Sequence, residues 1–146
     1  MTWNIWLSGR ATTASAFESL AREVGVSDRV RFLGSTDLQV LTELYRMADL
    51  FVMPSTGEGF GIAFLEAIVS GTPTLGLSVA GTTDALADGE LGTIVSEPEL
   101  PAAIVSLLAK PKPDPAALAA ATRARFGPPQ FADGVRAVLS RLMEAS

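Results

Sequence analysis

The chain has 146 residues, 48% of them hydrophobic, and a formal net charge of −5 from 11 basic and 16 acidic residues. This length and composition allow one domain with a sizeable core. No apolar run approaches the roughly 20 residues needed to span a bilayer, and no basic cluster suggests a nucleic-acid partner. We therefore expect no integral membrane segment and no nucleic-acid ligand.

Cysteine and histidine are both missing from the sequence. Disulfides and thiol chemistry are thus excluded, and so are the commonest general base and most zinc sites. We expect no metal to be held by this chain. The start of the sequence, residues 1–6, lacks the basic segment and long apolar run of a signal peptide, so the expected location is cytoplasmic.

Strands and helices alternate along the first 109 residues. Because most of the predicted strands are continuous apolar runs, the pattern predicts an α/β fold with one doubly wound parallel sheet. The predicted strands are residues 3–7, 30–33, 49–53, 73–77 and 92–95. The predicted helices are residues 14–24, 38–47 (with Asp37 as N-cap), 60–69 (stopped by Ser70 and Gly71), 81–87 and 101–109.

The pattern breaks at residues 110–115, K-P-K-P-D-P, where three prolines predict a stiff connector. Two alanine-rich helices are predicted beyond it, at 116–125 and 131–144, separated by residues 127–129. Neither holds enough apolar side chains for a core of its own. The predicted organisation is a Rossmann-like ligand-binding domain at 1–109, the connector at 110–115, and a helical tail at 116–146 that packs on the domain.

A glycine-rich corner, P-S-T-G-E-G-F-G at residues 54–61, joins the third predicted strand to the third predicted helix. Such a corner attracts anions because the first N–H groups of a helix have no partner within it. Gly57, Gly59 and Gly61 allow a ligand to approach the backbone closely. Ligands of doubly wound sheets bind at the carboxyl ends of the strands, where this corner lies.

Two carboxylates flank the corner, Glu58 and Glu66. If residues 58–66 were all helical, a rise of about 1.5 Å per residue would separate them by roughly 12 Å along the axis. This spacing suits a nucleoside diphosphate sugar, with the sugar at Glu58, the diphosphate at the helix start and the ribose at Glu66. The residues leave a plainer reading equally open, in which Glu58 complements the helix dipole and Glu66 faces solvent.

Residues 49–71 resemble the donor-binding domain of retaining GT-B glycosyltransferases of the family 4 type, the glycosyl transferases group 1. The signature of that family is E-x7-E within P-S…E-G-F-G…E-A…G-x-P, and residues 54–55, 58–61, 66–67 and 71–73 match it. The segments D-R-V-R-F-L-G at 28–34 and G-T-T-D at 81–84, where Asp84 replaces the usual Glu, extend the resemblance. It covers about residues 3–109.

The resemblance implies a role for each site residue. Glu58 is the expected catalytic residue beside the donor sugar, and Glu66 is expected to hold the ribose hydroxyls. Backbone N–H groups at Phe60 and Gly61 would hold phosphate or sugar oxygens, and Arg10 is either a diphosphate contact or a surface residue. The further residues expected to border the donor are Gly57, Gly59, Ser8, Gly9, Leu33 and Gly34.

In this family the donor domain begins one strand and one helix earlier, with an Arg and a Lys that clamp the diphosphate, and a separate N-terminal domain binds the acceptor. We therefore expect the chain to be the donor-binding part of an enzyme that transfers a sugar from a nucleoside diphosphate sugar to an acceptor hydroxyl with retention. The donor is a substrate, and no cofactor is expected. Alone, the chain is expected to be inactive and to need the N-terminal domain or subunit as its partner; an exposed sheet edge would also permit self-association.

Three alternatives stay open from the sequence. The first is a non-catalytic nucleotide-sugar-binding or partner subunit, and the second is a sugar-nucleotide epimerase-like domain, against which the E-G-F-G series argues. The third and weakest is a phospho-acceptor regulatory domain, which would need an acidic cluster at the strand ends. The strand at 49–53 ends instead in Met53 and is followed by Pro54, so no acidic residue stands at its end.

Overall fold

The computed structural model describes residues 4–8, 14–57 and 59–144, which fall into two compact units. Unit 1 is Met1–Leu41 and unit 2 is Thr42–Ser146. Each unit contains its own parallel sheet. Three residues that the sequence assigned to the donor site, Gly9, Arg10 and Glu58, lie outside the described residues.

Unit 1 is built on two parallel strands. The register pairs Ile5 with Val30 and Ser8 with Gly34, with an irregularity just before Ser8. Every residue of the first strand is exposed, although its first three side chains are apolar. The elements are β1 (Ile5–Ser8), α1 (Ala14–Glu23), η2 (Ser27–Arg29), β2 (Val30–Gly34) and the first part of α2 (Leu38–Met47).

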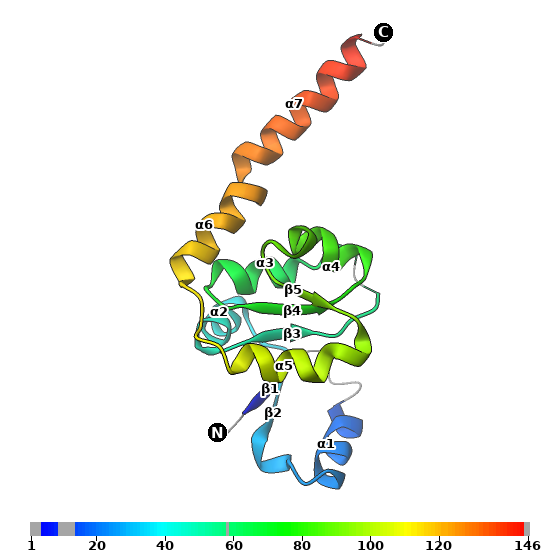
Figure 1. Ribbon diagram of the computed structural model, residues 1–146, viewed down its shortest axis with the longest axis vertical. Helices are drawn as coiled ribbons and strands as arrows, with labels where there is room; N and C mark the ends of the chain where they lie inside the picture. Colours follow the sequence, from blue (N-terminus) through cyan, green and yellow to red (C-terminus); the bar gives the residue numbers. More distant parts are fainter. Residues whose placement is uncertain (1–3, 9–13, 58, 145–146) are drawn as a thin grey trace. The chain divides into compact units, whose positions relative to one another are not determined.

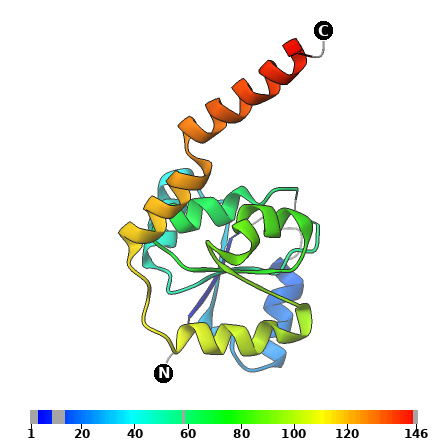
Figure 2. The ribbon, with the colours of Figure 1, turned by 45° about the horizontal axis from the view of Figure 1, so that its top comes forward.

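Unit 2 contains a three-stranded parallel sheet of order β3-β4-β5. The middle strand is buried along its whole length. Helices α3 and α4 cover one face of this sheet and α5 covers the other (Figures 1 and 2). The elements that form the body of unit 2 are β3 (Phe51–Met53), α3 (Ile62–Val69), β4 (Thr74–Leu77), α4 (Ala80–Ala85), η3 (Ala87–Gly89), β5 (Thr93–Val95), η4 (Glu97–Glu99) and α5 (Leu100–Leu108).

The predicted alternation of strands and helices is confirmed, and so is the α/β class with parallel pairing. The pairing differs from the prediction in one respect. The described strands form a pair and a triple instead of one continuous sheet, because no ladder joins β1 or β2 to the strands of unit 2. Sequence periodicity reports which segments are strands, but it carries no information on which strands are neighbours.

The core of unit 2 is centred on Phe64, which is fully buried on α3. Its ring meets that of Phe51 edge to face, with centroids 5.7 Å apart. Aliphatic residues from α3 and from the segment between β4 and β5 complete the buried cluster: Ile68, Ala85, Leu86, Ala87 and Leu91. This cluster fixes α3 to the sheet, and α3 carries the second glutamate of the motif.

The helix α3 begins at Ile62, two residues later than predicted. The reason is Gly61, which has a left-handed backbone conformation (φ 83°) that helical residues do not adopt. Its end is as predicted. Gly71 has φ 89°, and the N–H groups of Ser70, Gly71 and Thr72 close the last turn onto carbonyls of α3.

The C-terminal segment forms two helices, α6 (Pro115–Phe126) and α7 (Pro128–Glu144). Asp114 caps α6 by accepting a hydrogen bond of 3.0 Å from the Ala116 N–H, and α6 packs on α3. The sequence predicted that Pro128 and Pro129 separate the helices. They lie instead in the first turn of α7, where proline is tolerated, and Gly127 alone makes the break.

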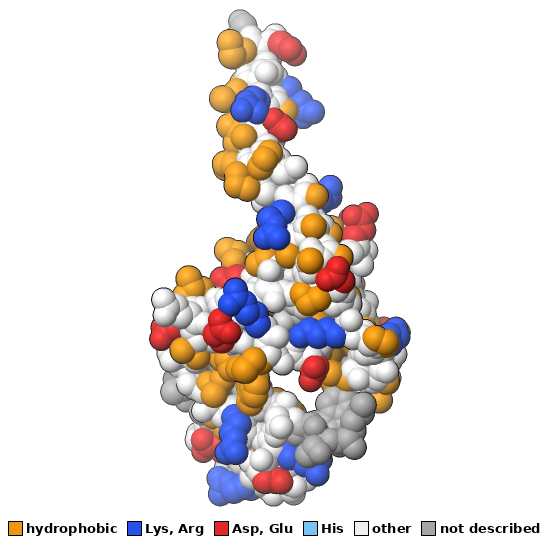
Figure 3. Space-filling view, turned by 90° about the vertical axis from the view of Figure 1, so that its left-hand side faces the viewer, with side chains coloured by type: hydrophobic (Ala, Val, Ile, Leu, Met, Phe, Trp, Pro, Cys, Tyr) orange, Lys and Arg blue, Asp and Glu red, His pale blue; other side chains and the backbone are white. Residues whose placement is uncertain are grey.

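The sequence predicted that both C-terminal helices pack on the domain, but no residue of α7 is buried. Its exposed apolar side chains recur every three or four residues, so they gather along one side of the helix (Figure 3). They are Phe131, Val135, Val138, Leu139, Leu142 and Met143. Throughout the described part of the chain, no helix has both the length and the apolar character that crossing a membrane requires.

Gly76 of β4 provides a test of this packing. An added Cβ there would lie 2.6 Å from Cζ of Phe64 and 2.5 Å from Cγ2 of Thr82, closer than carbon atoms pack. We predict that Gly76→Ala lowers the free energy of unfolding by about 1–3 kcal/mol, as overpacking of a core does. Urea denaturation followed by circular dichroism measures this.

The matched control is Gly134→Ala in α7, where a Cβ meets nothing within 4 Å. This substitution should be neutral or stabilising by up to about 1 kcal/mol, because alanine favours helix. Equal effects of the two substitutions would contradict the packing described for Phe64.

Candidate functional site

The glycine corner of unit 2 connects the end of β3 at Met53 to the start of α3 at Ile62. The Phe64 N–H donates to the Gly61 carbonyl at 2.9 Å, so the first turn of α3 is closed by the corner itself. The N–H groups of Ile62 and Ala63 are therefore those at the helix terminus, where a helix has no acceptor of its own for them. The sequence had assigned this role to Phe60 and Gly61, which precede the helix.

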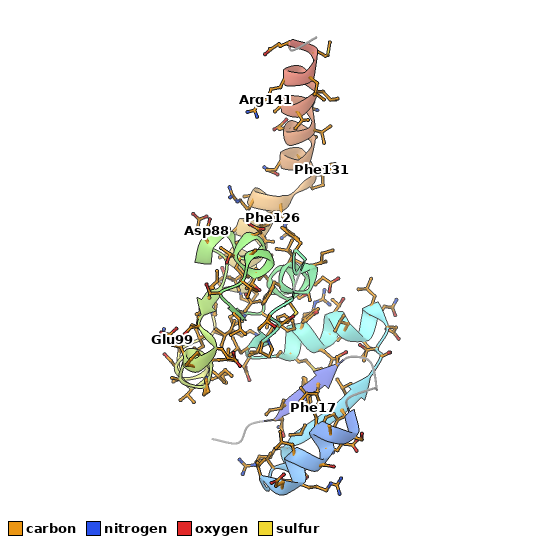
Figure 4. All side chains as sticks on the ribbon, turned by 90° about the vertical axis from the view of Figure 1, so that its right-hand side faces the viewer. Phe17, Asp88, Glu99, Phe126, Phe131 and Arg141 are labelled. Atoms are coloured by element: carbon orange, nitrogen blue, oxygen red, sulfur yellow. The ribbon has the colours of Figure 1, made fainter. Side chains whose placement is uncertain are left out.

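Most of the described corner is exposed, including Gly57, Gly59 and Phe60. A Cβ at Gly57 or Gly59 would meet nothing within 4 Å, so both positions are open to an approaching molecule. The Phe60 ring lies edge to face on that of Phe126, with centroids 5.8 Å apart. Phe126 ends α6 next to the body of unit 2, whereas Phe131 lies farther along on α7 (Figure 4). The corner is thus attached to α6 as well as to α3.

Glu66 is half-buried on α3, two residues after Phe64. The hydroxyl group of Tyr45 donates to Oε2 of Glu66 at 3.4 Å. Tyr45 belongs to α2 and is only 7% exposed. Tyr45 is therefore a core residue of unit 2 whose polar end contacts Glu66.

Three contacts hold Tyr45 and the end of α2 in place. The Tyr45 ring lies edge to face on Phe51, with centroids 5.4 Å apart. The buried hydroxyl of Thr72 donates to the Tyr45 carbonyl. Nζ of Lys112, in the connector before α6, donates to the Ala48 carbonyl at 2.6 Å. These contacts come from a strand, a loop and the connector, so the position of Tyr45 is fixed from several directions.

Burial raises the pKa of Tyr45 from its usual 10.0 to about 12, and the negative charge of Glu66 and the hydrogen bond to it act in the same direction. The phenol therefore stays protonated at neutral pH. A protonated phenol can donate to a carboxylate, so the hydroxyl group of Tyr45 is available to orient Glu66.

Helices α3 and α6 both contribute to the walls of a hollow of about 210 Å³. Its walls are mainly apolar, and Glu66 and Arg123 are its charged residues. The lining residues are Leu65, Glu66, Val69, Thr122, Arg123, Phe126 and Gly127. Glu66 thus contacts Tyr45 and also lines this hollow.

The predicted base-binding residues belong to unit 1. Ser8 and Gly34 are paired at the carboxyl end of the sheet, and the Ser8 hydroxyl donates to the Gly34 carbonyl at 3.4 Å. The same hydroxyl lies 3.3 Å from Oγ1 of Thr36. Leu33 is half-buried on β2. Ser8, Leu33 and Gly34 therefore lie together at one end of the sheet of unit 1.

The described residues contain no group of three or more aspartate, glutamate, histidine or cysteine side chains that could hold a metal ion. The groups that the described site offers are the backbone N–H groups of the helix terminus, glycines that leave the backbone open, and the Glu66 carboxylate. Such N–H groups can donate to phosphate oxygens, and a carboxylate can accept from hydroxyl groups.

Comparison with known families decides the membership. The family model described as glycosyl transferases group 1 matches residues 2–125. The chain belongs to this family. The resemblance noted from the E-x7-E series at residues 58–66 is thereby confirmed.

Among curated members of the glycosyl transferases group 1, D-inositol 3-phosphate glycosyltransferase of Corynebacterium aurimucosum is 41% identical over 88 residues. The alignment covers 60% of this chain and 21% of that protein. The enzyme of the same name from Mycolicibacterium smegmatis is 45% identical over 76 residues, 52% of this chain and 18% of that protein. The matched part is thus about a fifth of the length of these relatives.

Two solved structures are similar to this chain. WaaG, a glycosyltransferase involved in lipopolysaccharide biosynthesis, has a TM-score of 0.68 and 31% identity, covering 84% of this chain and 33% of WaaG. HepE of Anabaena, in complex with UDP and glucose, has a TM-score of 0.76 and covers 94% of this chain and 40% of HepE. At 23% identity the second likeness is one of fold.

The family motif did not indicate Tyr45, which lies 21 residues before Glu66 and outside the E-x7-E series. The available signal was weak. A tyrosine predicted to lie in a core needs an acceptor for its hydroxyl, and the sequence does not say which one. In this member of the glycosyl transferases group 1, the acceptor is Glu66.

The raised pKa of Tyr45 predicts a pH dependence of stability. Because the pKa is higher in the folded chain than its usual 10.0, the stabilising contribution is complete below pH 10 and is lost as the pH rises through about 12. We predict that the free energy of unfolding of the wild-type chain falls over this range, and that it falls less in Tyr45→Phe. Denaturant titrations between these pH values measure the difference. Identical pH profiles for the two chains would contradict the burial and pairing of the phenol.

Proposed function

We propose that this chain is the donor-binding part of a glycosyltransferase that moves a sugar from a nucleoside diphosphate sugar to an acceptor hydroxyl, with retention of anomeric configuration. The observation that carries the proposal is the combination, in a member of this family, of an open glycine corner, the helix terminus at Ile62 and a half-buried Glu66 held by Tyr45 about one turn into α3.

The proposed reaction needs little covalent chemistry from the chain. The bond between the anomeric carbon and the diphosphate oxygen breaks, and the acceptor oxygen bonds to the same carbon on the same face. The nucleoside diphosphate leaves with the electron pair of the broken bond, and the proton of the acceptor hydroxyl passes to the leaving diphosphate oxygen. With no histidine in the chain, its contribution is positioning of the donor and stabilisation of the leaving diphosphate.

The proposed roles follow the order of the motif. Glu58 lies beside the donor sugar and is the catalytic residue. The corner at Phe60 and Gly61, with the terminal N–H groups of α3, binds the phosphate or sugar oxygens. Glu66 accepts hydrogen bonds from the ribose hydroxyls, which its acceptor-only carboxylate suits.

The remaining proposed donor residues are those at the strand end of unit 1 and in the corner. Ser8, Gly9, Leu33 and Gly34 border the base, and Arg10 contributes positive charge toward the diphosphate. Gly57 and Gly59 keep the backbone open to the donor. This role is supported because a Cβ added at either position would meet nothing within 4 Å in the described structure. No metal or organic cofactor takes part in the proposal, and the nucleotide sugar is consumed as substrate.

We also propose that the chain lacks the first strand and helix of a complete donor domain. A doubly wound sheet of the common order 3-2-1-4-5-6 loses the link between its two halves when the first strand is removed. The strands that remain hydrogen-bonded are then a pair and a triple. The pairing β1-β2 and β3-β4-β5 has this pattern, which supports the assignment of the five strands as the second to the sixth.

The first prediction concerns activity. Because the proposed acceptor-binding part and the first strand are supplied by another domain or subunit, the purified chain should not turn over UDP-, GDP- or ADP-sugars. Co-expression with the acceptor-binding half should restore transfer, measured as release of nucleoside diphosphate. Turnover by the chain alone would contradict its incompleteness, and binding without restored transfer would favour a non-catalytic nucleotide-sugar-binding subunit.

The second prediction concerns Glu66. Loss of its carboxylate in Glu66→Ala should weaken binding of the nucleoside diphosphate roughly tenfold or more, as the loss of hydrogen bonds to a charged group does. Isothermal titration calorimetry with UDP, GDP and ADP measures it. The control is Glu90→Ala, which removes an exposed carboxylate elsewhere in unit 2. Unchanged affinity in Glu66→Ala would remove the ribose role.

A further inference from the structure

The contact between Tyr45 and Glu66 joins two helices that the family motif treats separately. Tyr45 is on α2 and Glu66 is on α3, and the phenol hydroxyl lies 3.4 Å from Oε2 of the carboxylate. We propose that Tyr45 is a positioning residue that orients the Glu66 carboxylate toward the ribose of the donor. This inference rests on the ribose role proposed for Glu66.

The difference in burial and contacts between the two side chains supports a positioning role. Tyr45 is buried, its ring is held by Phe51 and its backbone by Thr72. Glu66 is only half-buried and lines the hollow between α3 and α6, so its side chain is less confined than that of Tyr45. A glutamate in that position has several accessible rotamers, and a contact from a fixed partner selects among them.

The chemistry of the pair also supports the role. An ionised carboxylate has two oxygens and about four acceptor positions. Tyr45 takes one position on Oε2, and this leaves acceptor capacity for two vicinal hydroxyl groups. The donated hydrogen bond runs from a neutral phenol, so it orients the carboxylate without neutralising its charge. A cation in the same place would hold Glu66 in an ion pair and compete with the ribose for it.

The distance of 3.4 Å is longer than the usual O–H···O separation of about 2.7–2.8 Å. Burial is the main cause of the raised pKa of Tyr45, and the negative charge of Glu66 and the hydrogen bond to it act in the same direction. Catalytic and binding-site hydrogen bonds are often long before a ligand is bound and shorten in the complex. We therefore expect the hydrogen bond between Tyr45 and Glu66 to shorten when the donor binds.

The first arm of the test needs no nucleotide. The chain contains one tyrosine, so the 13Cζ resonance of labelled tyrosine reports Tyr45 alone. In Glu66→Gln, which removes the charge and keeps the shape of the side chain, the phenol should titrate at lower pH than in the wild type. An unchanged titration would overturn the proposal, because the two groups would then not be coupled in solution.

The second arm measures the preference for ribose. Affinities of the wild-type chain and Tyr45→Phe are compared for UDP, GDP and ADP and for the 2′-deoxy form of each. We expect the wild type to prefer the ribonucleotide, and Tyr45→Phe to lose about five- to tenfold of that preference while binding the 2′-deoxy form as before. A merely structural effect of the substitution would weaken both forms alike and leave their ratio unchanged.

The matched control is Thr74→Val, which also removes one buried hydroxyl of unit 2 but one with no hydrogen-bond partner in the described structure. It should leave both the ribose preference and the Tyr45 titration unchanged. In the double substitution Tyr45→Phe with Glu66→Gln, the loss of preference should not exceed that of Glu66→Gln alone, because both changes act on one interaction.

The possible failures are distinguishable. A wild-type chain that does not prefer ribonucleotides contradicts the ribose role of Glu66, and the positioning role falls with it. A wild type that prefers ribonucleotides and a Tyr45→Phe chain with the same preference contradict only the positioning role, and the proposed function stands.

Discussion

The packing of Phe64 is the constraint on which the rest of unit 2 depends. Its ring is fully buried and lies against two positions where only glycine fits. A Cβ on Gly61 would lie 2.8 Å from Cδ2 of the ring, and one on Gly76 would lie 2.6 Å from Cζ. One side chain thus connects the glycine corner, the helix that follows it and the middle strand of the sheet. The corner owes its shape to the core as much as to its own sequence.

The orientation of Glu66 follows from this packing. Successive residues of an α-helix are turned by about 100°, so a residue two positions after Phe64 points away from the buried face. The direction it takes leads to Tyr45, which Phe51, Thr72 and the turn of the chain at Lys112 hold in place. A hydrophobic contact therefore sets the direction of a polar group, and a neighbouring helix then refines it.

Much of this arrangement was predictable because it is local. The alternation of strands and helices, the Asp37 cap with its 2.9 Å bond to the Val40 N–H, and the stop at Gly71 are each encoded within a few residues. The start of α3 was placed two residues early because Gly61 has a left-handed backbone conformation, which the apolar pattern does not report. Strand neighbours, the exposure of α7 and the Tyr45–Glu66 contact depend on residues distant in sequence, which periodicity does not report.

The charge of the motif bears on which anion the proposed site would accept. The chain carries a net charge of −5, and the motif adds two carboxylates to a corner whose described residues supply no cation. A bare phosphate would gain the helix N–H groups but would also be repelled by both glutamates. A nucleoside diphosphate sugar presents hydroxyl groups to each carboxylate, so the same glutamates become hydrogen-bond acceptors. Selectivity of this kind comes from what the site repels as well as from what it attracts.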